Sequence, residues 1–285
     1  MNELMERIEV LMNEGIVIDT LSHGPLPWDE ELVKANDEML DKDVSAWEIV
    51  PELVLKFAHK LVNDDEYYQL YKDAWEQSNV NCVSWTIGPL HSKPYSFEGV
   101  FHNYAVMSYI LDHRSDFLVK VLKADDIERV VKENKRGIIL NFQSMQHIGE
   151  DIDLVELYYM MGVRIMQLTY NTKNLVGTGC TARRDRGLTD FGKQVVEKIN
   201  ELGAIVDVSH CGMQTSVDAV QYSKDPIIAS HTFSKELYDH DRGKTDDLLK
   251  AIAGKKGYIG ILAVAGFLTQ NSKTTIDDWL NHVDY

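Results

Sequence analysis

The sequence predicts an α/β fold of the (β/α)8 TIM-barrel type. Short β-branched runs alternate with amphipathic helical patterns, and the runs are almost continuously apolar, as parallel strands covered by helices are. A length of 285 residues with 44% hydrophobic residues can fill one barrel core, so we expect a single domain over residues 1–285. A doubly wound open sheet would give the same local pattern. It usually carries a Gly-rich phosphate-binding turn after its first strand, however, and "VIDTLSHGPLPW" is not such a turn.

Seven strands are expected in chain order. They cover residues 15–20, 80–88, 136–143, 163–170, 203–210, 226–231 and 257–264. The segment between the fourth and fifth strands illustrates the helical pattern, since Thr189 is a suitable N-cap and Gly203 a suitable helix end. Its apolar stripe consists of Phe191, Val195, Ile199 and Leu202.

Two segments interrupt this alternation. Residues 29–78 are acidic and aromatic-rich and could hold about two helices, so a helical insertion is expected after the first strand. Residues 171–188 form a long Gly-containing loop at a position where a barrel places its functional loops. This loop supplies Asn171 and Arg183 as candidate substrate-binding residues.

Charge and cysteine content exclude several classes of function. The formal net charge of −16 repels phosphate backbones and anionic headgroups, so neither nucleic acid nor a membrane surface is expected as a partner. Cys82, Cys180 and Cys211 are an odd number without a CxxC pair, which argues against a disulfide framework and fits a reducing compartment. The N-terminal "MNELMERIEVLMNEG" lacks the apolar core of a signal peptide, and no stretch reaches the ~18 apolar residues of a membrane span. A cytoplasmic protein is therefore expected.

Two consecutive strands end in the same dipeptide. Ser209-His210 ends "GAIVDVSH", and Ser230-His231 ends "PIIASH". In a barrel the carboxyl ends of all strands meet on one face, so the two imidazoles should lie together and could share a divalent metal, zinc above all. Alternatively, each His only hydrogen-bonds groups at its own strand end. The third and fourth strands end in Gln143 and Tyr170, which are either site residues or ordinary polar strand ends.

Four stretches of the second half carry a resemblance to a known family. They are "RIMQLTYNTKNLVGTGC", "GAIVDVSHCG", "DPIIASHTF" and "DHDRGKTDDLL". Together they resemble the membrane (renal) dipeptidase family of metallopeptidases, and more closely its soluble bacterial branch. The resemblance runs from about Gly137 to the C-terminus and is weak before Phe101. It implies a (β/α)8 barrel with a zinc centre that hydrolyses dipeptides, in which His210 and His231 bind metal and Arg242 binds the substrate carboxylate.

The chain departs from the family pattern at several ligand positions. Leu21-Ser22-His23 stands where the family has a His-x-Asp pair, and Gln143 stands where a Glu bridges two metals. A neutral amide binds zinc poorly and cannot bridge as an anion. The resemblance implies a binuclear zinc site, but these departures predict one zinc ion rather than two, on His210 and His231 with His23 or Gln143 as a further ligand.

Two more departures concern catalysis. Tyr170 takes the place of a His that contacts substrate, and it could donate a hydrogen bond to the developing oxyanion. The family's eighth strand, which ends in an Asp near the metals, has no counterpart after "TTIDDWLNHVDY", so we expect a barrel that lacks its eighth strand. A truncated sequence would explain this, or a second copy could close the wall, which makes a homodimer one expected assembly.

The expected function is a zinc-dependent, dipeptidase-like hydrolase that acts on a small carboxylate-bearing substrate. Two alternatives stay open. One is a catalytically impaired barrel that binds a small ligand or a protein, because several family ligands are missing. The other is a single-metal amidase or lactonase that acts on something other than a dipeptide.

Overall fold

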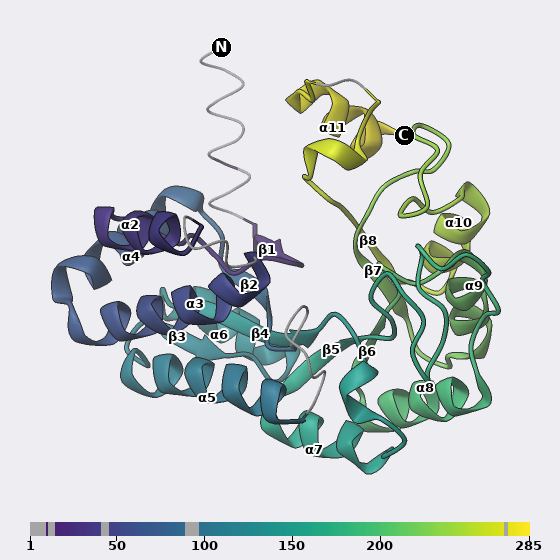
Figure 1. Cartoon of the computed structure of the whole chain (residues 1–285), viewed down its shortest axis with the longest axis horizontal. Helices are drawn as coiled ribbons and strands as arrows, with labels where there is room; N and C mark the ends of the chain where they lie inside the picture. Colours follow the sequence, from purple (N-terminus) through teal and green to yellow (C-terminus); the bar gives the residue numbers. More distant parts are fainter. Residues whose placement is uncertain (1–9, 11–14, 41–45, 89–96, 271–272) are drawn as a thin grey trace. The chain divides into compact units, whose positions relative to one another are not determined.

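The computed structural model describes residues 10, 15–40, 46–88, 97–270 and 273–285 (Figure 1). The chain forms two compact units, Met1–Leu140 and Asn141–Tyr285, which are described in turn. The N-terminal segment that lacks a signal-peptide core lies almost wholly outside the described residues, as do residues 41–45 of the expected insertion.

The strands of the first unit are short and parallel. β1 (Ile18–Asp19) pairs with β2 (Cys82–Thr86). β4 (Arg136–Phe142) follows β2 in strand order and runs from the first unit into the second. β3 (Leu118–Lys120), which the sequence pattern did not predict, pairs with the first three residues of β4.

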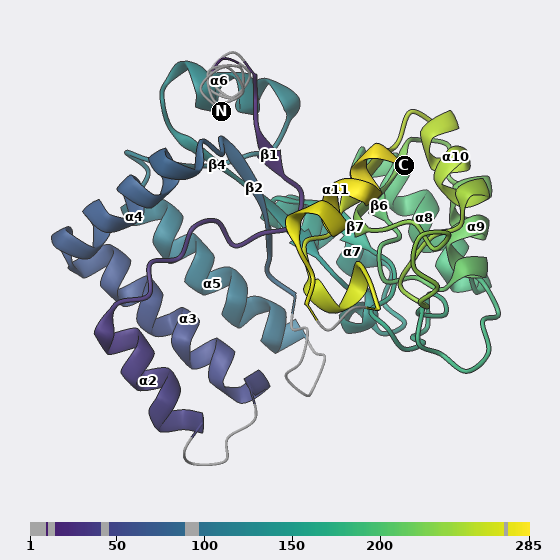
Figure 2. The same ribbon diagram turned by 90° about the horizontal axis from the view of Figure 1, so that it is seen from above.

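Helices make up most of the rest of the first unit. The insertion after β1 is helical, as expected, but its described residues hold three helices rather than about two: α2 (Glu30–Leu40), α3 (Ala46–Asn63) and α4 (Asp65–Ser78). Figure 2 shows α3 beside α2, α4 and α5 (Phe97–His113), while α6 (Ala124–Lys132) precedes β4. The buried side chains of α4 are aromatic, so rings rather than aliphatic groups form much of this core; they are Tyr67, Tyr68, Tyr71 and Trp75.

The second unit repeats a strand and a helix. β5 (Val163–Gln167), β6 (Ile205–Asp207), β7 (Ile227–Thr232) and β8 (Tyr258–Ile261) pair in parallel in this order. The helices are α7 (Asp153–Met161), α8 (Asp190–Leu202), α9 (Met213–Tyr222), α10 (Asp246–Gly254) and α11 (Ile276–Asp284). Single 3-10 turns lie at Gln146–Ile148 and Ala265–Phe267. Figures 1 and 2 show α8, α9 and α10 along one side of β6 and β7.

The fold class is confirmed. All seven predicted strands occur, six of them within their expected ranges, while β7 extends one residue further, to Thr232. The succession β1-β2-β4-β5-β6-β7-β8 alternates with helices as in a (β/α)8 barrel that lacks one strand. The helix expected between the fourth and fifth strands is α8. It begins after Thr189, whose hydroxyl accepts a hydrogen bond from the Gly192 N–H at 2.9 Å, and Gly203 ends it with φ 72°. Among the described helices, none is long and apolar enough to cross a membrane.

Candidate functional site

His210 and His231 lie next to each other at the carboxyl ends of β6 and β7. The two strands pair in parallel, with Asp207 opposite Ile228. The imidazole ring centres are 4.8 Å apart, and both residues are buried. Strands that run parallel deliver their ends to one edge of the sheet, so residues 21 positions apart in the sequence meet here.

Asp207 explains why a Ser precedes each His. Its buried carboxylate accepts hydrogen bonds from the Ser209 backbone N–H at 2.9 Å and hydroxyl at 2.6 Å, and from the Ser230 N–H at 3.2 Å. The Ser230 hydroxyl donates to the second carboxylate oxygen. The Ser209 hydroxyl oxygen in turn accepts from the His231 backbone N–H at 3.1 Å. A buried carboxylate needs such donors, and here they tie the two strand ends together.

His231 presents one ring nitrogen that has no protein partner. Its Nδ1 lies 2.8 Å from the Ser230 hydroxyl oxygen; since that hydroxyl donates to Asp207, Nδ1 carries the proton and donates. Nε2 is buried without a hydrogen bond. Burial, and then the positive charges of Arg242 and Lys244, hold the pKa of His231 well below its ordinary value, so the ring is neutral. A neutral imidazole with an unshared Nε2 lone pair is the form that binds a metal ion.

His210 is supported by the loop over residues 171–188. Its Nδ1 lies 2.7 Å from Asn171 Oδ1, which can only accept, so Nδ1 donates and Nε2 is the ring nitrogen that would bind a metal ion. The Tyr170 ring stacks on the imidazole with 4.0 Å between ring centres. Asn171 has a left-handed φ of 57°, which Asn tolerates, and its carbonyl accepts from the Thr181 N–H at 2.9 Å. The structure therefore brings Tyr170 and Asn171 directly to His210.

Arg242 contacts the backbone of both strand ends. Its buried guanidinium donates to the Ser209 carbonyl and, at 3.1 Å, to the His231 carbonyl, so it links the same two strand ends. Its Nε–H is buried without a hydrogen-bond partner. The site thus contains two unsatisfied buried polar atoms of opposite character, a lone pair on His231 and a donor on Arg242.

Comparison with known proteins assigns the chain to a family. A family model described as membrane dipeptidase (peptidase family M19) matches residues 5–285. The chain belongs to the membrane dipeptidase family. The match confirms the resemblance that the motifs of the second half indicate, and it extends to the first half, where the sequence motifs are weak.

Individual relatives are similar to this membrane dipeptidase family member over different shares of their length. An uncharacterized dipeptidase of Schizosaccharomyces pombe is 30% identical over 167 residues, which cover 56% of this chain and 40% of that protein. Dipeptidase tcpJ of Claviceps purpurea is 26% identical over 191 residues, which cover 66% of this chain and 45% of that protein. The chain thus spans less than half the length of either relative. A crystal structure of an amidohydrolase from Pseudomonas aeruginosa is similar with a TM-score of 0.74 and 28% identity, over 97% of this chain and 71% of that one.

The three remaining predicted site residues of this membrane dipeptidase family member are Gln143, Arg183 and His23. Gln143 is buried just after β4, and its carbonyl accepts a hydrogen bond from the Gln167 side chain. Arg183 is exposed and lines a separate cavity of about 340 Å³, whose lining residues do not include His210 or His231. His23 belongs to the first unit, where it packs edge-on against Trp85 at 5.0 Å.

Lys244 is a buried residue of the site that sequence reasoning missed. Its ammonium group donates to the Cys211 carbonyl at 2.6 Å and to the Ser216 hydroxyl at 3.0 Å. Burial lowers the pKa of Lys244 to about 8. Asp207 was missed as well, although "DVSH" places it two residues before Ser209 and its polarity inside an apolar strand was a visible signal.

The metal-binding capacity of the pair can be judged from its donors. Within the described residues, no cluster of three or more His, Cys, Asp or Glu side chains is arranged to hold a metal ion. The two imidazoles remain as donors, and the unpaired buried Nε2 of His231 costs ~1–3 kcal/mol unless a ligand satisfies it. This donor set fits a single cation whose remaining ligands are groups other than these two imidazoles.

Proposed function

We propose that the chain is a metal-dependent hydrolase that cleaves the amide bond of a dipeptide or a similar small substrate with a free carboxylate. The observation that carries the proposal is the pair of unsatisfied atoms: His231 Nε2 suits a cation, and Arg242 Nε–H suits an anion. A metal-activated hydrolase acting on a carboxylate-bearing substrate needs both. Membership of the membrane dipeptidase family and relatives named as dipeptidases support the same reaction class.

The proposed ion is zinc, one per chain, held by His210 and His231 with His23 or Gln143 as a further ligand. Nitrogen-rich sites favour zinc among the common divalent ions. A zinc ion, when bound, acts as a Lewis acid on the scissile carbonyl and makes water nucleophilic near neutral pH.

The chain's own residues hold the ligands and the substrate. Asp207 acts through Ser230 to keep the proton of His231 on Nδ1, and Asn171 does the same for His210. Tyr170, stacked on His210, would donate its phenolic proton in a hydrogen bond to the oxyanion that forms as the carbonyl is attacked. Arg242 would hold the substrate carboxylate through its unused N–H groups, and Arg183 and Asn171 are proposed as further substrate contacts.

We also propose a cytoplasmic location and a homodimer. All three cysteines are free thiols and are buried, which suits a reducing compartment. A second copy could pair with an exposed strand edge of the barrel.

Metal analysis and a substrate panel test the proposed function. Protein purified without chelator should contain about one zinc per chain, and His210→Ala or His231→Ala should remove it. His113→Ala is a matched control because His113 is an exposed helical residue far from β6 and β7 in sequence. Retention of zinc by both site variants would refute the metal centre. If the protein contains zinc but does not cleave dipeptides, the amidase or lactonase alternative is favoured. If it neither contains zinc nor cleaves dipeptides, the impaired barrel that binds a small ligand or a protein is favoured.

A further inference from the structure

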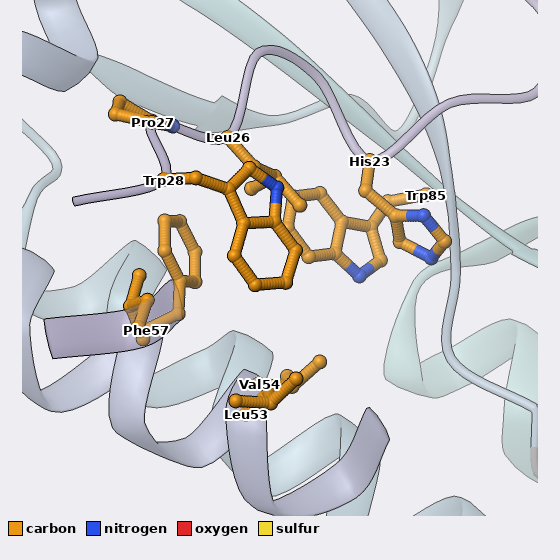
Figure 3. Close-up of a pocket in the computed structure, with 9 residues that line it drawn as sticks. His23, Leu26, Pro27, Trp28, Leu53, Val54, Phe57 and Trp85 are labelled. Atoms are coloured by element: carbon orange, nitrogen blue, oxygen red, sulfur yellow. The ribbon is translucent and has the colours of Figure 1, made fainter. Parts of the chain in front are cut away.

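The first unit contains a cavity whose lining, apart from His23, has no part in the proposed function. It has a volume of about 150 Å³, and its lining is almost wholly apolar. Figure 3 shows the rings of Trp28, Phe57 and Trp85 around a common space, with Leu53 and Val54 pointing toward it from α3. The polar groups of the lining are the imidazole of His23 and the indole N–H groups of Trp28 and Trp85.

The walls of the cavity are held in place by interactions outside it. The Tyr67 hydroxyl donates to the Pro27 carbonyl at 2.6 Å, which fixes the segment that carries Trp28. The Lys60 ammonium bridges Asp29 at 2.8 Å and Glu31 at 2.5 Å, so it joins α3 to the start of α2.

The rings of the wall also support one another. Phe57 stacks on Trp85 with 6.4 Å between ring centres and 24° between planes, and His23 contacts the same indole edge-on. Anchored rings do not readily collapse into the space between them, so the cavity is a feature of the folded unit.

The size and chemistry of the cavity define its occupant. An apolar cavity of ~150 Å³ offers water few hydrogen bonds and has room for one benzene ring. We propose that it binds an uncharged ligand through a single aromatic ring or a branched aliphatic group of that size. Trp28 is 56% exposed, so the rest of such a ligand would leave the cavity along this indole. The cavity lies within residues 23–85 and shares only His23 with the residues proposed for the zinc centre, so toluene binding can fail without refuting that centre.

A titration with toluene tests the proposal on the full chain. Toluene should produce saturable shifts in the NMR signals of the Trp28 and Trp85 indole N–H groups, with a dissociation constant on the order of 1 mM or below. Benzoate, which has the same ring but a charge, should bind at least about tenfold more weakly, because the apolar lining cannot pair a carboxylate.

Two variants on α3 separate the cavity from nonspecific binding. Val54→Phe places a ring inside the cavity and should weaken toluene binding at least about tenfold. Leu55→Phe adds the same ring one residue away on an exposed position outside the lining, and it should bind toluene like the original chain. The proposal is wrong if the unsubstituted chain shows no saturable shift, or if both variants bind toluene equally.

Discussion

At Ser230 one hydroxyl joins the Asp207 carboxylate to Nδ1 of His231. Ser230→Ala removes this acceptor, so the imidazole loses both its fixed tautomer and its fixed orientation. We expect the affinity for zinc to fall ~10–100-fold, as for other residues that orient a metal-binding His. A competition titration against a zinc-binding indicator measures this change.

Ser234 provides the control for that change. It is as buried as Ser230, but its hydroxyl has no hydrogen-bond partner. Ser234→Ala therefore makes the same chemical deletion without breaking a bond, and zinc affinity should be unchanged. Equal affinities in the two variants would show that Ser230 does not position the ligand.

Lys244 should give the stability of the chain a particular pH dependence. Burial lowers its pKa from 10.5 to about 8, so the folded chain loses this proton at lower pH than the unfolded chain. Between these two values the unfolded chain binds more protons, and the free energy of unfolding therefore rises with pH, by about 3 kcal/mol in total. Below pH 8 the ammonium is charged in both states and this gain is absent.

Lys244→Met provides the comparison, since it retains an unbranched apolar stem and has no titratable group. Urea unfolding measures the free energy of unfolding of both proteins from pH 7 to pH 11. As pH rises, this free energy should increase more for the original chain than for Lys244→Met. A difference that stays constant over this range would mean that the buried Lys keeps an ordinary pKa.

The residues of the site differ in how visible they are in the sequence. His210 and His231 could be predicted because parallel strands bring their ends together whatever the intervening chain contains. The roles of Asp207 and Lys244 could not, because they depend on which carbonyls and hydroxyls the folded strand ends turn inward. Asn171 was predicted to contact substrate, and the structure shows its side chain on His210.

Among the elements, length decides what the pattern can predict. The seven predicted strands contain apolar runs long enough to show a β period, and α8 shows its cap, stripe and end in sequence. β3 has three residues, Leu118–Lys120, which is too short to show alternation, and it exists because the start of β4 offers it a partner. The helical insertion could be predicted as an insertion, but the break between α3 and α4 at Asp64 depends on an N-cap that forms only in the folded chain.

Helix ends in the second unit allow a clean test of backbone conformation. Gly203 ends α8 with φ 72°, and a Cβ added there would meet no atom within 4 Å. Gly203→Ala should therefore destabilise the fold through backbone strain alone, by ~1–2 kcal/mol.

Gly254 lies at the end of α10, also with open space around it but without a positive φ. Gly254→Ala should be neutral or stabilise by up to ~1 kcal/mol. Thermal unfolding of both variants measures this, and equal losses would contradict the argument.

On the scale of the whole molecule, the fold class follows from repetition. A chain built of repeated β/α units has few ways to bury its apolar strands. A barrel buries all of these strands at once beneath its outer helices. The apolar cavity of the first unit was not predictable, because its walls come from a loop, two helices and a strand that are separated by up to 62 positions between His23 and Trp85. Periodicity shows which face of an element is apolar, but it does not show where two such faces fail to fill the space between them.

The net charge of −16 bears on how zinc binding should be tested. Such a chain attracts any divalent cation at low ionic strength, whereas at about 0.15 M salt the Debye length is ~8 Å and only a built site retains the ion. Under these conditions zinc at about 100 times its dissociation constant should stabilise the second unit by ~2.7 kcal/mol and raise its Tm by roughly 5–10 °C. Magnesium at the same concentration should not do so, because it prefers oxygen ligands. In His231→Ala the zinc shift should vanish, while His113→Ala should keep it. A shift that magnesium reproduces, or that survives His231→Ala, would show that the charge of the whole chain binds the cation, and not the two imidazoles at the ends of β6 and β7.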